Sequence, residues 1–453
     1  MSESATTLLR APEESGGPLP GLDRNAVEAL VASGPPWLGQ RRLEAWRVYE
    51  ETPMPTTKEE EWRYTDLSKT LRLGELRLLP REEREFAPEG APALLTGSMR
   101  SDRAAAGHVV DLDGSVAHTD LEEEVARKGV VLASLARAVE TFPELLEAHL
   151  ATEALPASSG KFQALNAALW TDGVLLFVPR GVHVELPVRV TRWFSGPGRA
   201  VFTRTLIVAE EGSRVSFVDE ALSADFPAQT LVSSAIEVFA RRGAHVQFVS
   251  LQRMGRGTFH LSQQRTLADA DAALDTLNVS FGASVARVDL NAELRGAGAH
   301  SDMLGLCFGE ADQHFDHNTS QDHGAPHTKS DLLYKAALDG AARAVFRGII
   351  RVHPGAQQTD AYQTNRNLIL SPDARAESLP NLEIEADDVR CSHGATVGQL
   401  DEEHLFYLMS RGLTRAQAER LVVTGFLGEV LSRLPLGGVV EKVSGIIEER
   451  LRA

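Results

Sequence analysis

The sequence predicts a mainly β protein with a β-solenoid core between two helical regions. From residue 172 to 398, short runs of Val, Ile, Leu, Phe and Thr alternate with polar residues, as strands do. A turn followed by alternating apolar residues recurs there at intervals of 31, 28 and 27 residues, without intervening helices. A β-sandwich is the competing architecture, because turns also recur at regular intervals in β-sandwich proteins. The turns stand at Gly212, Gly243, Asp271 and Gly298, and further ones at Gly340, Gly355, Asp373 and Gly394.

The patterns divide the chain into four parts. Residues 1–20 are rich in Ser, Gly, Pro and Glu, and we expect a flexible tail there. Residues 21–171 form an N-terminal, mostly helical region, 172–398 the solenoid core, and 399–453 a C-terminal helical region. In the N-terminal region we expect helices at 25–33, 39–50, 121–128, 132–140, 142–151 and 162–169, and a hairpin at 107–118.

Between the second and third of these helices lies a segment rich in aromatic and acidic residues. The prolines at 53 and 55 end the preceding helix, and Thr57 with Glu60 three residues later is typical of a short capped helix. Trp62 and Tyr64 follow. We expect both rings to anchor this segment by packing, in preference to a binding role.

The C-terminal region predicts three amphipathic helices. Asp401 caps a helix at 402–410 that ends at Gly412, and Thr414 opens a second helix that reaches about Arg433. A third covers 439–451. Their apolar stripes require a partner, which is either the body of this chain or another protein.

Composition and missing motifs exclude several functions. The formal charge of −17 argues against a nucleic-acid binder, and no apolar run is long enough for membrane insertion. Two cysteines and the lack of a signal-like start indicate a soluble cytoplasmic protein. No Walker, zincin or α/β-hydrolase motif occurs, so we expect no bound nucleotide and no catalytic residues. A β-helical carbohydrate enzyme remains a remote alternative, disfavoured by an aromatic content of 6%.

Two sets of side chains suggest metal chemistry. In a strand Cys391 and His393 point to the same side, where a thiolate and an imidazole can hold iron, zinc or copper. On residue types alone, a buried cysteine beside a hydrogen-bonded histidine is the favoured interpretation, because cysteine is commonly a small core residue. Residues 312–327 carry four histidines, but a solvated loop between coils fits this stretch better than a closed metal site. The weaker metal candidates in that stretch are His314, His317 and His323.

Several motifs together resemble one protein family. Residues 358–368 (QTDAYQTNRNL), and residues 382–398 followed by 401–412 (DEEHLFYLMSRG), are similar to motifs of the SufB/SufD family, which assembles iron–sulfur clusters. The dense match covers about residues 310–430, and a looser one covers most of the chain. The EEWRYT sequence at 60–65 and the CSHGATVG sequence at 391–398 resemble SufD. SufB commonly has a Glu-His-Glu-Ala type sequence where this chain has CSHGATVG.

The resemblance implies helices, then a right-handed parallel β-helix, then a helical tail. It implies a non-catalytic scaffold subunit that pairs edge to edge with a SufB-like paralogue and binds the ATPase SufC, to which ATP hydrolysis belongs. A nascent iron–sulfur cluster would be built transiently at the SufB interface. His393 matches the family histidine implicated there, and Cys391 lies beside it, although the persulfide-carrying cysteine belongs to SufB. The SufC contacts would be Phe406, Tyr407, Arg411, Gly412 and Phe426 in the tail helices.

Two further points follow from the resemblance. Some complexes of the family are reported to bind reduced flavin, and no motif in this sequence identifies a flavin site. A SufB-like homodimeric scaffold, which works without a separate SufB, is the alternative to a heteromeric subunit.

Overall fold

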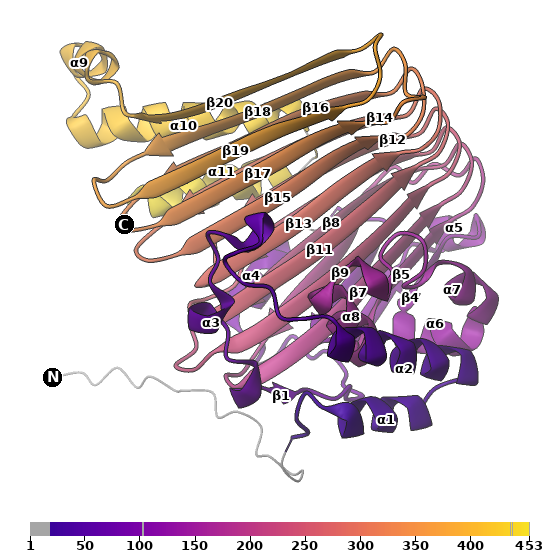
Figure 1. Ribbon diagram of the computed structural model, residues 1–453. Coiled ribbons are helices and arrows are strands. Elements are labelled where there is room, and N and C mark those ends of the chain that lie inside the picture. Colours follow the sequence, from indigo (N-terminus) through magenta and orange to yellow (C-terminus); the bar gives the residue numbers. More distant parts are fainter. Residues whose placement is uncertain (1–18, 102–103, 435, 437, 453) are drawn as a thin grey trace, which may run out of the picture.

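The core is a parallel β-solenoid made of two facing sheets of ten strands each (Figure 1). The computed structural model describes residues 19–101, 104–434, 436 and 438–452. From β5 onward successive strands alternate between the sheets, so each coil adds one strand to both. The predicted solenoid is confirmed over the competing sandwich. The first sheet contains β1 (Arg77–Leu78), β4 (Val131–Ser134), β5 (Asp172–Val178), β7 (Arg199–Ala209), β9 (Thr230–Ala240), β11 (Thr258–Ala268), β13 (Val285–Leu294), β15 (His314–His323), β17 (Arg343–Val352) and β19 (Arg375–Ile384).

The second sheet runs from the N-terminal hairpin to the last strand of the chain. Its strands are β2 (Gly107–Leu112), β3 (Ser115–Leu121), β6 (Val188–Phe194), β8 (Arg214–Ser223), β10 (His245–Arg253), β12 (Ala273–Ser280), β14 (His300–Gly309), β16 (Lys329–Leu338), β18 (Asp360–Ile369) and β20 (Arg390–Gln399).

Inward-facing side chains stack in columns from coil to coil. Val215, Val246 and Leu274 stand in register on β8, β10 and β12, and each is buried. Neighbouring strands lie about 4.8 Å apart, so each column is a continuous line of apolar contact along the solenoid. The hydrophobic core therefore runs the length of the stack, with members from both sheets.

The predicted turns form the corners between coils. Gly212, Gly243, Gly298 and Gly340 have φ of 67°, 64°, 75° and 62°, and Asp271 has φ of 59°. At Gly340 two features disfavour a larger residue. One is the positive φ, and the other is that an added Cβ would lie 2.7 Å from the backbone nitrogen of Ala311. The prediction was wrong at Gly394, which lies inside β20. The corner before that strand is the bend at residues 387 and 388.

The N-terminal region extends both sheets and is less helical than predicted. The hairpin of β2 and β3 is present, and β2 also pairs in parallel with β6. The first residues of the helix predicted at 132–140 belong instead to β4, which pairs with β5. There the chain becomes helical only at Leu135, where Ser134 caps α6. The tail predicted for residues 1–20 lies outside the described residues except for Leu19 and Pro20.

Helices cover the outer faces of both sheets. α2 and α8 pack over the first sheet near β7 and β9, whereas α10 lies on the second sheet across β14 and β16 (Figure 1). No helix in the described part of the chain is both long and apolar enough to cross a membrane. The helices are α1 (Arg24–Ala32), α2 (Pro36–Glu51), η1 (Glu60–Trp62), α3 (Leu67–Thr70), η2 (Leu73–Glu75), α4 (Ala93–Ser101), α5 (Glu123–Arg127), α6 (Leu135–Thr141), α7 (Pro143–His149), η3 (Ala157–Ser159), α8 (Lys161–Leu169), α9 (Glu402–Ser410), α10 (Arg415–Arg433) and α11 (Val439–Arg450).

Candidate functional site

The solenoid is open at its C-terminal end. β19 is the last strand of the first sheet and β20 the last strand of the second, and within the described residues each has a partner on one side only. Arg390 N donates to the carbonyl oxygen of Thr359, the residue just before β18. Because parallel strands direct alternate residues to opposite neighbours, the odd-numbered residues of β20 then direct their N–H and C=O groups to the free edge. Such an edge can accept another strand.

Cys391 and His393 lie on the inner face of this last coil. Their register partners on β18 are Ala361 and Gln363, which are buried between the sheets. Cys391 is half-buried and packs against an apolar cluster that includes Ala361 and Ala386. Burial raises the pKa of the Cys391 thiol. His393, one coil above Gln363, is exposed. The strand therefore presents a thiol and an imidazole on one face at the open end.

The pair carries two donor atoms of the kind that metal ions bind. A cysteine sulfur and a histidine nitrogen are both ligands for iron, zinc and copper. Closed structural sites use four ligands, and catalytic zinc sites use three. Cys391 and His393 supply two donors at most. Further ligands would come from a chain that covers the edge.

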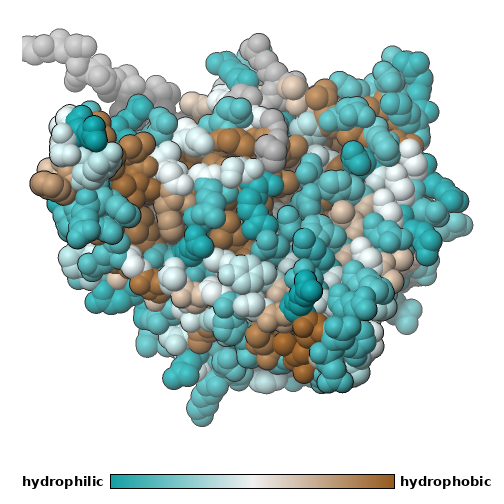
Figure 2. Space-filling model, turned by 90° about the horizontal axis from the view of Figure 1, so that it is seen from above, coloured by the Kyte–Doolittle hydropathy of each residue, from teal (hydrophilic) through white to brown (hydrophobic). Residues whose placement is uncertain are grey.

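Large apolar side chains surround the open edge. Val397 on β20 is 50% exposed, Tyr362 on β18 44% and Ile384 at the end of β19 40%. Figure 2 views the molecule from above Figure 1, and brown apolar patches are visible on that surface between polar ones. Exposed apolar groups of this size beside an unpaired strand edge are typical of an interaction surface.

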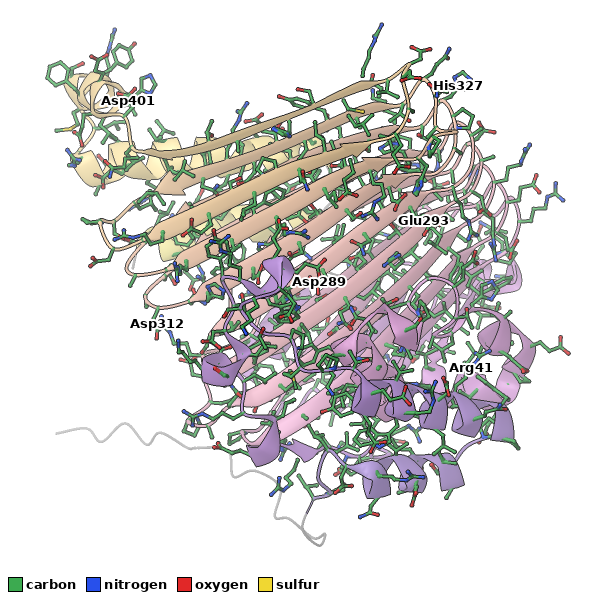
Figure 3. All side chains as sticks on the ribbon, viewed as in Figure 1. Arg41, Asp289, Glu293, Asp312, His327 and Asp401 are labelled. Carbon is green, nitrogen blue, oxygen red and sulfur yellow. The ribbon has the colours of Figure 1, made fainter. Side chains whose placement is uncertain are left out.

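A second exposed apolar group lies on α9, directly after β20. Figure 1 shows α9 projecting at one corner of the molecule, and Figure 3 labels Asp401 at its start. The Asp401 side chain caps the helix by accepting from the backbone N–H groups of residues 403 and 404. Phe406 is 73% exposed and Tyr407 57%, and the Arg411 guanidinium lies 5.1 Å from the Tyr407 ring centroid. Gly412 follows α9 at a φ of 96°.

The remaining tail residue, Phe426, faces the body of the molecule. Its ring lies 4.4 Å from Lys335 Nζ of β16, and the same ammonium donates to the Phe426 carbonyl at 2.8 Å. The predicted tail residues thus separate into two sets. Phe406, Tyr407, Arg411 and Gly412 gather around α9, and Phe426 fastens α10 to the second sheet.

The histidine-rich stretch is the strand β15 and not the loop that we expected. His314 is half-buried beside Thr65, with 2.8 Å between its Nε2 and the hydroxyl oxygen. His317 lies between the sheets and contacts Ser280 at 3.0 Å, and His323 contacts Thr328 and Ser330. Burial lowers the pKa of all three imidazoles, to about 4 for His317 and His323. The strand holds the three apart, in separate hydrogen-bonded environments.

One potential ligand set was missed by the sequence reasoning. Among the described residues, a single group of three ligating side chains comes together, formed by Asp275, His300 and Asp302. The signal was present in the repeats, since His245 and His300 both stand two residues after a corner glycine. Only the coil register shows that Asp275 lies between them.

Comparisons with known proteins agree with the resemblance in the motifs. A family model described as "SUF system FeS cluster assembly, SufBD core domain" matches residues 192–426, and one described as "SufBD protein N-terminal region" matches residues 22–190. The iron–sulfur cluster assembly protein SufD of Bacillus subtilis is 30% identical over 92% of this chain and 95% of its own length. Iron–sulfur cluster assembly SufBD family proteins of Staphylococcus haemolyticus and Staphylococcus epidermidis are each 26% identical, over 93% of this chain and 91% of their own length.

Proposed function

The chain belongs to the SufBD family of iron–sulfur cluster assembly proteins, and we propose that it is a scaffold subunit of the SUF assembly complex without a reaction of its own. The main support for the proposal is the open C-terminal end of the solenoid. There an unpaired strand edge, exposed apolar side chains and the Cys391–His393 pair occur on the same last coil. A surface that offers two ligands and a free edge is suited to a site shared between two chains.

The partner at this edge would be a SufB-like paralogue. A second solenoid of the same family would end in an equivalent edge strand, so the two sheets could continue from one chain into the other through β20. The exposed side chain of Val397 would then be buried at the seam. Cys391 and His393 would face residues of the partner, which would complete the ligand set for a nascent cluster.

The ATPase subunit SufC would bind at α9. This helix is fastened to α10 by Arg415, which pairs with Glu402 at 2.6 Å and with Glu419 at 2.8 Å. α10 is in turn joined to β16 through Lys335 and Glu429. A displacement of α9 by a nucleotide-driven partner would therefore reach the second sheet, whose last strand carries His393.

The proposed mechanism uses this connection. SufC would bind and hydrolyse ATP, and its motion would open or twist the seam between the two solenoids. Sulfur would arrive on the paralogue, and iron would be captured at the exposed seam. The part of this chain is to supply the His393 imidazole, a competent ligand for iron, together with the half-buried Cys391 thiol. The cluster is the cargo of the complex and leaves with the acceptor protein.

Co-expression with the SufB-like and SufC proteins of the same organism tests the assignment. We expect one complex that contains all three chains, with a mass determined by light scattering. A chain that associates with neither protein would contradict the proposal. A homodimer of this chain that assembles clusters without a paralogue would support the SufB-like alternative instead.

Two substitutions test the seam itself. Ala395 directs its N–H to the free edge, so Ala395→Pro removes one edge donor and leaves the bonds to β18 intact. We expect it to abolish pairing with the paralogue, whereas Leu43→Glu on exposed α2 should not. His393→Ala should preserve the complex and lower cluster assembly. Unchanged assembly with His393→Ala would remove that residue from the mechanism.

A further inference from the structure

A cluster of imidazole and carboxylate side chains lies on the outer face of the second sheet, far along the chain from the open edge. One ligating atom from each of Asp275, His300 and Asp302 lies within 4.8 Å of the others. We propose that these three residues bind a divalent first-row transition-metal ion, and that His245 holds Asp275 in position. The proposal is independent of the scaffold function proposed above, because it concerns another face and other coils.

The stacking of three coils builds the cluster. His245 on β10, Ala273 on β12 and His300 on β14 stand side by side in register, and Asp275 is the register partner of Asp302. All point outward, since the residues that alternate with them, such as Leu274 and Ser301, are buried. The small methyl side chain of Ala273 leaves room between the imidazoles of His245 and His300.

Side chains of the cluster already lie at ion-pairing and hydrogen-bonding distances from one another. His300 Nε2 lies 3.3 Å from Asp302 Oδ1, and His245 Nε2 lies 2.7 Å from Asp275 Oδ2. Carboxylates that bind a metal are themselves held in place by hydrogen bonds from neighbouring groups. We therefore assign His245 to positioning and the other three residues to ligation.

The local charge favours a cation. The side chains of Asp275, Asp302 and His300 are 17%, 27% and 33% exposed, so they are partly shielded from solvent but open on one side. The two carboxylates and the imidazole can each direct one ligating atom to a single cation there.

Two basic side chains border the site. Lys329 follows His300 in the same column of register partners, and Arg433 of α10 lies 3.6 Å from Asp302. Arg433 has a closer partner in Asp331, at 2.9 Å. Arg433 can keep its ion pair with Asp331 while the Asp302 carboxylate binds a metal ion. Arg433 therefore does not block metal binding.

The donor set selects the class of ion. One imidazole nitrogen with two carboxylate oxygens suits Mn²⁺, Fe²⁺, Co²⁺ or Zn²⁺. No thiol takes part, which disfavours Cu⁺. Three protein ligands on a half-open surface leave coordination positions for water or an exchangeable ligand. This arrangement fits an ion that is bound reversibly.

Calorimetric titration of the full chain tests the site. The protein is purified without a histidine tag, stripped with a chelator and titrated with Zn²⁺ and Mn²⁺, and with Fe²⁺ under nitrogen. We expect one saturable site per chain for at least one of these ions. His300→Ala and Asp302→Asn should each weaken it by about 100-fold, and His245→Ala by about 10-fold.

His353→Ala is the matched control. His353 Nε2 lies 2.7 Å from Asp322 Oδ1, so this pair has the same chemistry as His245 and Asp275 but belongs to no group of three ligands among the described residues. The control should bind the ion as the unsubstituted chain does, with circular dichroism to check that every variant folds. Absence of saturable binding, or an equal loss in the control, would overturn the proposal.

Discussion

The guanidinium of Arg287 lies over the indole of Trp62, with its central carbon 3.7 Å from the ring centroid. The two residues are far apart in sequence, since Trp62 ends η1 and Arg287 belongs to β13. Arg287 also donates to the Glu61 carbonyl at 2.8 Å and is held by Asp316 and by Asp289, which Figure 3 labels on the first sheet. This contact fastens the N-terminal segment to the middle of the solenoid, as the predicted anchoring role of Trp62 requires.

Loss of the Trp62 ring should destabilise the N-terminal segment. Trp62 is 8% exposed, and replacing a buried tryptophan by alanine typically costs about 3–5 kcal/mol. We expect Trp62→Ala to lower the urea midpoint and to admit proteases between α2 and α3. Trp62→Phe, which keeps an aromatic face for Arg287, should lose less. Equal protease resistance in the unsubstituted and Trp62→Ala proteins would contradict the anchoring role.

Acid should destabilise the protein through its buried histidines. Burial lowers the pKa of His323 to about 4, whereas an unfolded histidine titrates near 6.5. The unfolded chain therefore takes up a proton first as the pH falls. The stability contributed by neutral His323 is complete above about pH 6.5, and about 3 kcal/mol is lost as the pH falls to about 4.

The histidine variant His323→Gln should reduce this acid sensitivity. An amide can still bond to Thr328 and Ser330 but does not titrate, so the urea midpoint should fall less between neutral and acidic pH. His118→Gln, at an exposed position on β3, serves as the control and should behave as the unsubstituted protein. Identical pH profiles for all three proteins would refute the assignment of this sensitivity to His323.

The two cysteines should differ in reactivity. Cys307 is 2% exposed and burial strongly raises the pKa of its thiol, whereas Cys391 is half-buried at the open edge. A thiol reagent should label one cysteine per native chain and both in urea. Cys391→Ser should remove the native labelling. If the SufB-like partner covers the edge, its addition should slow the labelling of Cys391, and unchanged kinetics would argue against pairing there.

Substitutions on α9 should separate binding from stability. Phe406 and Tyr407 are exposed, so replacing both by alanine should change the free energy of unfolding by no more than about 1 kcal/mol. Binding of the ATPase subunit should weaken by at least about 30-fold if both are central contacts. Leu43→Ala, also at an exposed apolar position, should change neither property. Normal ATPase binding by the double variant would exclude α9 as the contact.

The local elements were largely predictable because local signals define them. Asp401 and the Thr414–Gln417 capping box give α9 and α10 their first residues, and the structure confirms both caps. The corners at Gly212 and Gly298 were predictable for a similar reason, since a left-handed conformation favours glycine. These features depend on residues that are near one another in sequence.

The errors occurred where distant strands decide the conformation. Residues 132–134 have the character of a helix start, but pairing with β5 draws them into the first sheet. Residues 314–323 looked like a polar loop, yet strand pairing with β13 and β17 buries most of their polar groups. In both places long-range hydrogen bonds outweighed the local preference.

For the candidate sites, the sequence by itself determined which residues are present and which share a strand face. Cys391 and His393 share one because side chains alternate along a strand. Only the tertiary structure decided that His245, Asp275 and His300 meet, and that Trp62 lies on Arg287. The physical reason is the stacking of coils. Residues about thirty positions apart are brought to the strand spacing of about 4.8 Å, and a shift of one residue in register would turn each of them to the opposite face.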